Sequence, residues 1–521
     1  MTLYFPSIFN DVIGPVMRGP SSSHCAASLR VGRLARDLMN GQIDEVLIEF
    51  DPHGSLAATH ASQGSDMGLF GGLLGWEAHD ERLPHAVREF HDAGLKAHIK
   101  IIEYGAVHPN TYRITLQSQA GSHQLTALST GGGMVEITEI DGAAVSIAGD
   151  GFETLVYVSD NEEAVVERIR EIFSADQFRL CRGKGACFIE IKAREFPADD
   201  VCGAVRAMPE VVDIKKLAPV LPVLSRPGVT VPFITCKEML EYNGRKARAL
   251  WEHAVFYEST RAGLSESGVI DKMAGIVRLM RDSIQNGIAG TRYDDRILGY
   301  QSGGFKQQMT NRRLLDGGML NHMVLYVTAM MEMKSAMGVI VAAPTAGSCG
   351  TLPGACLGAA DFLDLDETEI ARALLAAGLI GVFIAAGSTF AAEDAGCQAE
   401  CGAASGMAAA ALVTLARGTV RQAVGASSMA LQNILGLVCD PVANRVEVPC
   451  LGKNVLAVSN ALSAANMALA GFDQVIPLDE VIAAMDAVGR SIPSQLRCTA
   501  QGGLSVTPAS KAIMQRLKTQ V

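Results

Sequence analysis

Residues 373–392 form the most constraining stretch of this chain, because they read ALLAAGLIGVFIAAGSTFAA and carry no charge. A run of this length can cross a lipid bilayer as a helix. It is mostly Ala and Gly, however, and the charged sequence EDAGCQAE follows at once. This composition favours a helix buried among other helices, so we expect a helical domain around it and no membrane association.

The rest of the chain divides into regions of different pattern. From about residue 237 onward, Ala-, Leu- and Met-rich runs with apolar residues on nearly all faces predict an all-α domain over 237–521. Residues 1–150 mix strand-like runs such as EVLIEF and TYRITLQSQ with Gly-rich turns and a helical stretch near 24–40. This pattern predicts an α+β domain. A chain of 521 residues is expected to form several domains.

Residues 152–222 have the sharpest pattern between these two regions. Strand-like and helix-like segments alternate there in the order βαββαβ, with a hairpin turn expected at RGKG. This is the ferredoxin-like order. At this length the segment resembles an ACT domain, and the resemblance implies a regulatory module that binds a small molecule. Such a module is expected to present an open sheet and two helices, through which two copies form a homodimer.

Composition excludes some function classes. The formal net charge is −11 and there is no basic stripe, which argues against nucleic acid as a partner. The opening sequence MTLYFPSIFNDVIGP lacks the pattern of a signal peptide, so a cytoplasmic location is expected. In that reducing compartment the 12 cysteines are expected to be buried, catalytic or metal-bound rather than paired in disulfides.

Three cysteines are the leading candidates for metal ligands. Cys397 precedes Cys439 by 42 residues, and Cys450 follows Cys439 after 11, with Pro441 and Pro449 in the same segment. No CxxC pair is present, so a zinc ribbon or finger is not expected. Thiolates are soft ligands suited to iron–sulfur clusters or zinc, and three of them leave one metal position open. The alternative is that each is a small buried apolar residue.

Several motifs together carry a family resemblance. They are GPSSSH (19–24), GSLAATHASQGSD (54–66), APTAGSCGTLPG (343–354), AGCQAECGAASGMAAAAL (395–412), LGLVCDPVANRVEVPC (435–450) and LRCTAQGGLSVTPA (496–509). In this order they resemble the bacterial iron–sulfur-dependent L-serine dehydratases, with a β-type and an α-type part fused around the ACT-like module. The resemblance implies a 4Fe–4S cluster on Cys397, Cys439 and Cys450 with one iron free for substrate. It also implies conversion of L-serine to pyruvate and ammonia without pyridoxal phosphate.

Two Gly-rich segments are expected to be substrate-binding loops, because Gly lets backbone groups approach a ligand closely. Residues Ser302, Gly303 and Gly304 form the first, and Lys306 beside it is a candidate partner for the substrate carboxylate. Residues Thr345, Gly347 and Ser348 belong to the second. Alternatively, both segments are ordinary tight turns between helices, and Lys306 is a charged side chain in solvent.

Two polar residues near the N-terminus are further candidates for the substrate site. His24 ends the polar loop GPSSSH, which leads into a helix and could take a carboxylate. In the family this region builds a substrate or effector pocket. Asp66 lies in QGSD, where the family commonly has His-Gly-Thr-Asp, so Gln63 stands in place of that histidine and cannot act as a base.

Other positions also depart from the family pattern. They are Cys25, where Thr is usual, Ala391 and Ala392, where Ser-Gly is usual, and Cys498, where Glu is usual. Cys349, Cys401 and Cys498 are each expected to be structural or to line the pocket rather than to supply a fourth metal ligand. These departures leave open a different β-substituted amino acid as substrate, elimination of sulfide from cysteine, or a non-catalytic amino-acid sensor that carries a cluster.

Overall fold

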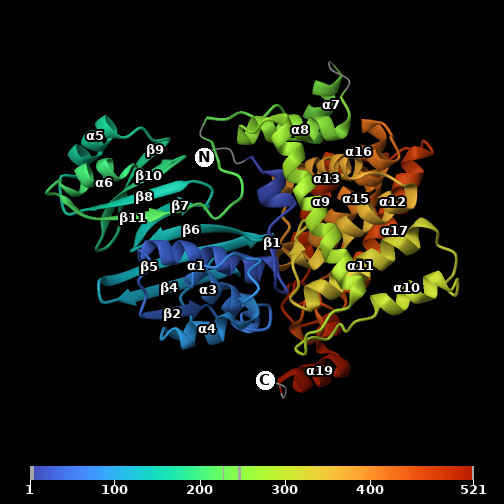
Figure 1. The fold of residues 1–521 in the computed structure, drawn as a ribbon, viewed down its shortest axis with the longest axis horizontal. Coiled ribbons are helices and arrows are strands. Elements are labelled where there is room, and N and C mark those ends of the chain that lie inside the picture. Colours follow the sequence, from blue (N-terminus) through green and yellow to red (C-terminus); the bar gives the residue numbers. More distant parts are fainter. Residues whose placement is uncertain (1–4, 227, 245–247, 519–521) are drawn as a thin grey trace. The chain divides into compact units, whose positions relative to one another are not determined.

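The computed structural model describes residues 5–226, 228–244 and 248–518, and its contacts divide the chain into two compact units (Figure 1). We call them the helical unit and the sheet unit. The helical unit comprises the residues up to 23, residues 131–133 and the residues from 229 onward. The sheet unit comprises residues 24–130 and 134–228.

A six-stranded mixed sheet forms the first half of the sheet unit. Its strand order is β3-β2-β4-β5-β6-β7, with β3 parallel to β2 and β4 antiparallel to both β2 and β5. The strands are β2 Glu45–Phe50, β3 Lys96–Ile101, β4 Thr111–Ser118, β5 Gly121–Gly131, β6 Met134–Ile140 and β7 Ala143–Ile147. The α+β class predicted for this region is confirmed.

Helices pack beside this sheet: α1 Ala27–Leu38, α2 Leu56–Thr59, α3 Ser65–Leu73 and α4 Ala86–Asp92. The backbones of α1 and α3 approach each other closely at small residues. A Cβ atom placed on Gly72 would lie 2.1 Å from the Leu29 carbonyl oxygen, and one on Gly68 would lie 2.0 Å from that of Cys25. Only glycine therefore fits at these two positions of α3.

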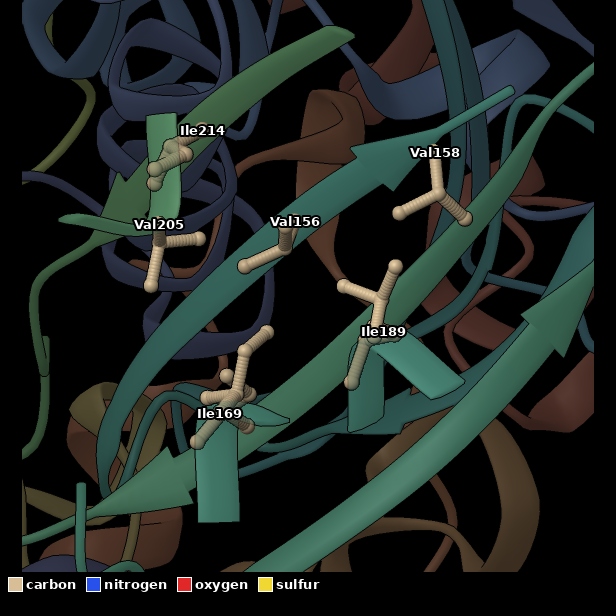
Figure 2. Packing of buried hydrophobic residues seen from close by; sticks show 8 residues of the cluster. Val156, Val158, Ile169, Ile189, Val205 and Ile214 are labelled. Carbon is tan, nitrogen blue, oxygen red and sulfur yellow. The ribbon is translucent and has the colours of Figure 1, made fainter. Parts of the chain in front are cut away.

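A four-stranded antiparallel sheet with two helices forms the second half of the sheet unit. Its elements are β8 Phe152–Val158, α5 Glu162–Ile172, β9 Gln177–Arg182, β10 Cys187–Ala193, α6 Asp199–Arg206 and β11 Val211–Leu217. The strand order is β11-β8-β10-β9. Figure 2 shows the core, in which side chains such as Val156, Ile189 and Ile169 converge from the sheet and helices. The predicted order of elements and the hairpin between β9 and β10 are both confirmed.

The face of this sheet that points away from α5 and α6 is buried within the sheet unit. Leu155 and Phe188 on that face are fully buried, and Glu153 is 1% exposed. The Tyr157 hydroxyl donates a 2.7 Å hydrogen bond to Asp141, which joins this face to the turn between β6 and β7. The expectation of an open sheet was wrong, because the preceding domain already covers it.

The helical unit is built almost entirely from helices, as predicted. Its longer helices are α8 Leu250–Ala262, α9 Glu266–Ala289, α11 Met319–Ser335, α12 Thr351–Leu363, α13 Glu367–Gly387, α15 Ala403–Leu415, α16 Val420–Gln432, α17 Cys450–Leu469, α18 Leu478–Ser491 and α19 Pro508–Lys518. The shorter ones are α7 Cys236–Asn243, α10 Ser302–Thr310 and α14 Ala392–Ala395. The Ala-rich helix α15 is buried along nearly its whole length.

Helix α13 contains most of the uncharged stretch with which the sequence analysis began. Among the described residues it is the one helix long and apolar enough to cross a membrane, but 78% of its most apolar window is buried inside the protein. Its neighbours include α8, α9 and α15. The predicted buried helix is confirmed.

The N-terminal segment belongs to the helical unit rather than to the sheet unit. A π-helical turn, Ile8–Val12, packs against α13. Strand β1, Val16–Met17, pairs antiparallel with β12, Ile340–Val341. The helical unit is thus assembled from segments more than 200 residues apart in the chain.

Candidate metal centre

Cysteines from three segments of the helical unit gather with one glutamate. The ligand atoms of Cys397, Glu400 and Cys439 lie within 4.8 Å of one another. Cys450, the first residue of α17, interacts electrostatically with Cys397 and Glu400. We call these four residues the cysteine centre. All three of its thiols are buried.

Cys397 is positioned by the glycine that precedes it. Gly396 follows α14 with a φ of +71°, a left-handed conformation that favours glycine. A Cβ atom there would lie 2.9 Å from the Leu437 carbonyl oxygen. The Gln398 amide donates a 3.0 Å hydrogen bond to that same oxygen. The backbone around Cys397 is therefore fixed against the segment that leads to Cys439.

The loop between Cys439 and Cys450 is also held by hydrogen bonds. The Cys439 amide donates to the Leu496 carbonyl at 2.8 Å, and the Val442 amide donates to the Val448 carbonyl at 2.8 Å. These contacts close the loop on itself and on the segment near residue 496. Cys450 then begins α17 directly after Pro449.

Asn454 ties the cysteine centre to one of the predicted substrate loops. Its Nδ2 donates 2.8 Å hydrogen bonds to the carbonyls of Gly347 and Cys450. Its Oδ1 accepts a 2.8 Å hydrogen bond from Thr351. The asparagine is fully buried. It therefore fixes the start of α17 relative to the turn at 345–348.

Lys453 brings a positive charge to the same place. Its Nζ lies 3.7 Å from Cys397 Sγ, donates to the Val438 carbonyl at 2.6 Å and pairs with Asp440 at 2.9 Å. Burial acts to lower the pKa of Lys453, but Cys397 and Asp440 hold the pKa above its ordinary value. The side chain thus stays charged beside the thiols.

Without a metal ion, the thiols of Cys439 and Cys450 hold their protons. Hydrogen bonds with Cys397 and Cys498 raise the pKa of Cys439 well above its ordinary value, and burial adds to the effect. Burial likewise raises the pKa of Cys450. A soft metal cation that displaces these protons would give the buried thiolates the counter-charge they otherwise lack.

Glu400 was not predicted from the sequence, although it lies three residues after Cys397 in a π-helical turn. Its Oε1 accepts a 2.6 Å hydrogen bond from Thr345 Oγ1, and its Oε2 lies 3.8 Å from Cys397 Sγ. Burial raises the pKa of Glu400, and the hydrogen bond from Thr345 opposes that rise. A Cβ atom on Gly347 would lie 2.7 Å from Oε1, so Gly347 leaves the room that this carboxylate occupies.

The structure brings one of the two predicted substrate loops to the cysteine centre. Thr345 caps the short 3₁₀ turn Ala346–Ser348, and its side chain accepts from the Ser348 amide. Thr345 contacts Glu400, and Gly347 accepts from Asn454. Ser348 is buried beside them and donates to the Ala343 carbonyl at 3.1 Å.

The other predicted loop is a helix rather than a loop. Residues 302–304 form the first turn of α10, so the expectation of a Gly-rich loop there was wrong. The Ser302 amide and hydroxyl both donate to the buried carboxylate of Glu332, at 3.0 and 2.7 Å. Together with the bond from the Gln301 amide to the same carboxylate, these bonds give partners to two backbone amides at the start of the helix, which helps a Gly-rich sequence to begin one. Lys306 is exposed on the same helix.

His24 and Asp66 lie in the sheet unit. His24 Nε2 is 2.8 Å from Thr59 Oγ1, and burial lowers the pKa of His24 to about 3, so the ring is neutral at physiological pH. Asp66 lies 2.8 Å from Nδ1 of His60, a histidine that the sequence analysis did not single out. Gln63, which stands in place of the family's histidine, is buried. His60 precedes it by three residues in the sequence.

The remaining departures from the family pattern lie in different surroundings. Ala392 and Cys498 pack with Cys397 and Cys439 in one buried cluster. Ala391 lies against Gly131, whose Cβ would be 3.2 Å from that of Ala391. Cys25 is fully buried, which raises the pKa of its thiol to about 12.

Two further cysteines lie near the centre without joining this cluster. Cys349 is fully buried, and its thiol lies 3.9 Å from Met331 Sδ. Cys401 lies 3.7 Å from Asn454 Nδ2.

Comparison with known proteins gives the chain clear relatives. The family model described as "Serine dehydratase alpha chain" matches residues 233–505, more than half of the chain. A Bacillus subtilis (strain 168) protein named "Probable L-serine dehydratase, alpha chain" is 36% identical over 285 residues, which cover 55% of this chain and 95% of that protein. The "L-serine dehydratase, alpha chain" of Peptoniphilus asaccharolyticus is 34% identical over 281 residues, covering 54% of this chain and 96% of that protein.

Another relative is named as a beta chain rather than an alpha chain. The Bacillus subtilis (strain 168) protein named "Probable L-serine dehydratase, beta chain" is 38% identical over 156 residues. This match covers 30% of the present chain and 70% of that protein. One chain therefore holds regions similar to both an alpha and a beta chain.

Proposed function

Because this chain belongs to the serine dehydratase alpha chain family, we infer that it is a lyase that dehydrates and deaminates L-serine to pyruvate and ammonia. The observation within the structure that carries this inference is the cysteine centre. It joins three buried thiols and a half-buried carboxylate to a turn that carries hydroxyl and amide groups.

We propose that Cys397, Cys439 and Cys450 hold a 4Fe–4S cluster. The donor set fits such a group, because thiolates are its ordinary ligands and these three come from rigid, hydrogen-bonded segments. Lys453 fits as well, since a positive charge 3.7 Å from Cys397 Sγ offsets the negative charge of a thiolate-bound cluster. When bound, the cluster supplies an iron with an open position that stabilises the hydroxyl leaving from Cβ of the substrate.

The turn at 345–348 is the proposed anchor for the substrate carboxylate. Its backbone amides and the hydroxyls of Thr345 and Ser348 are groups that donate hydrogen bonds. Asn454 holds the Gly347 carbonyl, so the turn keeps its position relative to Cys450. A fixed turn holds the substrate in one orientation, which is worth a large part of the rate enhancement.

The proton on Cα of the substrate requires a base, and Glu400 is the proposed one. It is the carboxylate whose ligand atoms lie among those of Cys397 and Cys439. Thr345 occupies Oε1 with a hydrogen bond, which leaves Oε2 to accept the proton. Loss of that proton and of the hydroxyl leaves an aminoacrylate, which becomes an imine and hydrolyses to pyruvate and ammonia without further help from the protein.

Ser302, Gly303, Gly304, Lys306, His24 and Asp66 remain proposed substrate or effector contacts. Lys306 is exposed, so it is free to move toward an anionic ligand. Ser302 is committed to Glu332, so its proposed role is to orient the start of α10 rather than to touch the substrate. His24 and Asp66 each contact another side chain of the sheet unit and are proposed contacts for a carboxylate there.

We also propose that residues 152–222 act as an ACT-like module that binds an amino acid and joins two copies of the chain. The βαββαβ order and the strand order β11-β8-β10-β9 support this proposal. Because the sheet face opposite the helices is already covered, the contact between copies would use α5, α6 or a strand edge. A cytoplasmic location is proposed for the enzyme, since an oxygen-sensitive cluster is stable in a reducing compartment.

The deciding experiment is an assay of the anaerobically reconstituted protein. It measures iron content, 2-oxo acid and ammonia with L-serine, L-threonine and L-cysteine. We expect about four irons per chain and turnover with L-serine. Turnover with L-cysteine alone would indicate sulfide elimination, and binding of amino acids without turnover would indicate a sensor. Absence of iron from the reconstituted protein would contradict the proposed cluster.

A further inference from the structure

A second lysine lies close to the cysteine centre, near the end of α11. The side chain of Lys334 is 0% exposed and is among the largest fully buried side chains of the described residues. Its Nζ donates a hydrogen bond to the Val446 carbonyl, which belongs to the loop between Cys439 and Cys450. The mechanism proposed above gives this lysine no role.

The ammonium group of Lys334 has no anionic partner in contact with it. Among the described residues, the Val446 carbonyl is its one hydrogen-bond partner, and no carboxylate oxygen lies within 4.0 Å of its Nζ. Lys453 differs in this respect, because it pairs with Asp440 at 2.9 Å. A charge removed from water costs free energy unless an opposite charge offsets that cost. A fully buried ammonium group without a carboxylate partner therefore points to a negatively charged group that the protein binds nearby.

Groups of the cysteine centre lie within the electrostatic reach of this charge. Lys334 interacts electrostatically with Cys450, Cys349 and Glu400, and in each case its charge favours the negative form of the group. Helix α11 packs against α12 and against α17, the helix that begins at Cys450. One turn before Lys334, Met331 Sδ lies 3.9 Å from the Cys349 thiol. These contacts place Lys334 on the α11 side of the centre, near Cys450.

The two lysines of the site act on different cysteines. Lys453 Nζ lies 3.7 Å from Cys397 Sγ. Of the two positive charges, that of Lys334 has the larger effect on Cys450. Three thiolates and one divalent cation together carry a net negative charge, so a buried positive charge beside them stabilises the metal-bound form. Lys334 supplies such a charge where Lys453 contributes less.

We propose that Lys334 is a positioning residue of the cysteine centre, and that its ammonium group is the buried counter-charge for a thiolate-bound metal at Cys450. Through its hydrogen bond to Val446, the same side chain holds the loop that carries Cys439 and Cys450. This proposal rests on the metal centre proposed above. Lys334 forms no bond to the metal, and it acts through its charge and through the loop.

The cadmium affinity of the metal-free protein is the first test. Cadmium is a soft divalent cation that binds thiolates, and its sulfur-to-metal absorption reports the binding. We expect Lys334→Met, which fills a similar space without a charge, to bind cadmium at least about tenfold more weakly than the unchanged protein. Lys334→Gln retains a donor for the Val446 carbonyl but no charge, and it should also bind more weakly. Lys511→Met, at an exposed position of α19, is the control and should bind with unchanged affinity.

The reduction potential of the iron–sulfur cluster in the anaerobically reconstituted protein is the second test. Charge near a cluster sets part of its potential, because a positive charge favours the reduced and more negative cluster. We expect a more negative midpoint potential in both neutral variants of Lys334 and an unchanged potential in Lys511→Met. A side chain that only filled space would not shift the potential in this direction. Circular dichroism of each variant verifies that it is folded.

The outcomes separate the two proposals. If the unchanged protein binds cadmium but forms no iron–sulfur cluster, the proposed cluster fails, and the cadmium test still decides the role of Lys334. If it binds neither metal, the metal centre fails, and the role of Lys334 fails with it. If the cluster forms but either neutral variant binds cadmium as tightly as the unchanged protein, or keeps the unchanged potential, Lys334 is not the counter-charge, while the cluster proposal stands.

Discussion

A different local structure positions each of the three cysteines. Cys397 follows a glycine with a left-handed backbone, Cys439 begins a hydrogen-bonded loop, and Cys450 lies in the first turn of α17. Three separate local structures bring these thiols together, which indicates a site that binds a metal group. The sequence pointed to these three cysteines through their motifs. It did not point to Lys453, Asn454 or Glu400, because spacing along the chain does not tell which polar side chains fold against a thiol.

Replacing any one ligand should destroy the cluster. We expect Cys397→Ser, Cys439→Ser and Cys450→Ser each to abolish the brown absorption at about 400 nm and the activity. Cys236→Ser is the control, because Cys236 is a buried cysteine at the start of α7, where its amide binds Asp479. Ultraviolet–visible spectra and iron analysis provide the measurement. A full cluster in any of the three ligand variants would show that this residue is not a ligand.

Glu400→Gln separates proton transfer from metal binding. Glutamine keeps the shape of the side chain and an oxygen for the Thr345 hydroxyl, but it cannot take a proton. We expect iron content to stay unchanged and kcat to fall at least about 100-fold, the usual contribution of a general base. The measurement pairs iron analysis with the rate of pyruvate formation. A variant that retains activity would exclude Glu400 as the base, and one that loses iron would instead make Glu400 a ligand.

At the scale of elements, the sequence predicted best where a pattern is local. The alternation in residues 152–222 and the uncharged stretch of α13 each predicted their own element correctly. The start of α10 was missed, because Ser302 and the glycines after it look like a loop. Glu332, thirty residues away from Ser302, accepts the amides of Gln301 and Ser302 and the Ser302 hydroxyl. The covered face of the second sheet was missed as well, because a strand pattern does not tell which neighbouring segment packs on it; here the turn between β6 and β7 accepts the Tyr157 hydroxyl through Asp141.

Helix α13 packs against the N-terminal turn through glycines, and this contact can be tested. A Cβ atom on Gly381 would lie 2.1 Å from Val12 Cγ1. We expect Gly381→Ala to lower the free energy of unfolding by about 1–3 kcal/mol through overpacking. The control is Gly275→Ala in α9, where the nearest atom would be the end of Arg278 at 4.0 Å. That change should raise stability by about 0.5–1 kcal/mol, and calorimetry measures both. If both substitutions changed the free energy of unfolding equally, the close contact between Gly381 and Val12 would be excluded.

Glu153 gives the sheet unit a pH-dependent stability. It is 1% exposed, neither oxygen accepts a hydrogen bond from the described residues, and Lys192 Nζ lies 3.6 Å away. Burial raises the pKa of Glu153 to about 8, with Lys192 opposing the rise. The folded state therefore binds the proton more tightly than the unfolded state. This contribution is fully present below the ordinary pKa and is lost as pH rises through about 8.

The replacement Glu153→Gln should remove this dependence. We expect the variant to gain stability relative to the unchanged protein as pH rises from about 5 to about 8, by at most about 1.4 kcal/mol per pH unit. Melting temperatures at several pH values measure the difference. Glu163→Gln, at an exposed position of α5, is the control and should show no such trend. A constant difference across this range would mean that Glu153 is ionised in the folded protein throughout.

At the scale of the whole molecule, the chain crosses between its units more than once. Sequence patterns assign residues 1–150 to one region, yet the contacts place residues 5–23 in the helical unit. No local pattern could have predicted this, because the partners of the segment lie some 250 residues away. The buried carboxylate of Glu258 accepts hydrogen bonds from the Ser7 hydroxyl at 2.6 Å and the Ile8 amide at 2.8 Å.

This arrangement predicts that the protein can be divided into two polypeptides without coming apart. Ile8, Phe9, Val12 and Ile13 are almost fully buried in the helical unit. At about 1.5–3 kcal/mol each, their burial contributes on the order of 6–12 kcal/mol, comparable to the cost of association. We therefore expect residues 1–228 and 229–521, produced together as separate chains, to copurify through a tag on one of them. Removal of residues 1–13 should weaken that association strongly, because the four apolar side chains and the contacts to Glu258 are lost together. Copurification that is equally strong without these residues would show that the segment does not anchor the two polypeptides.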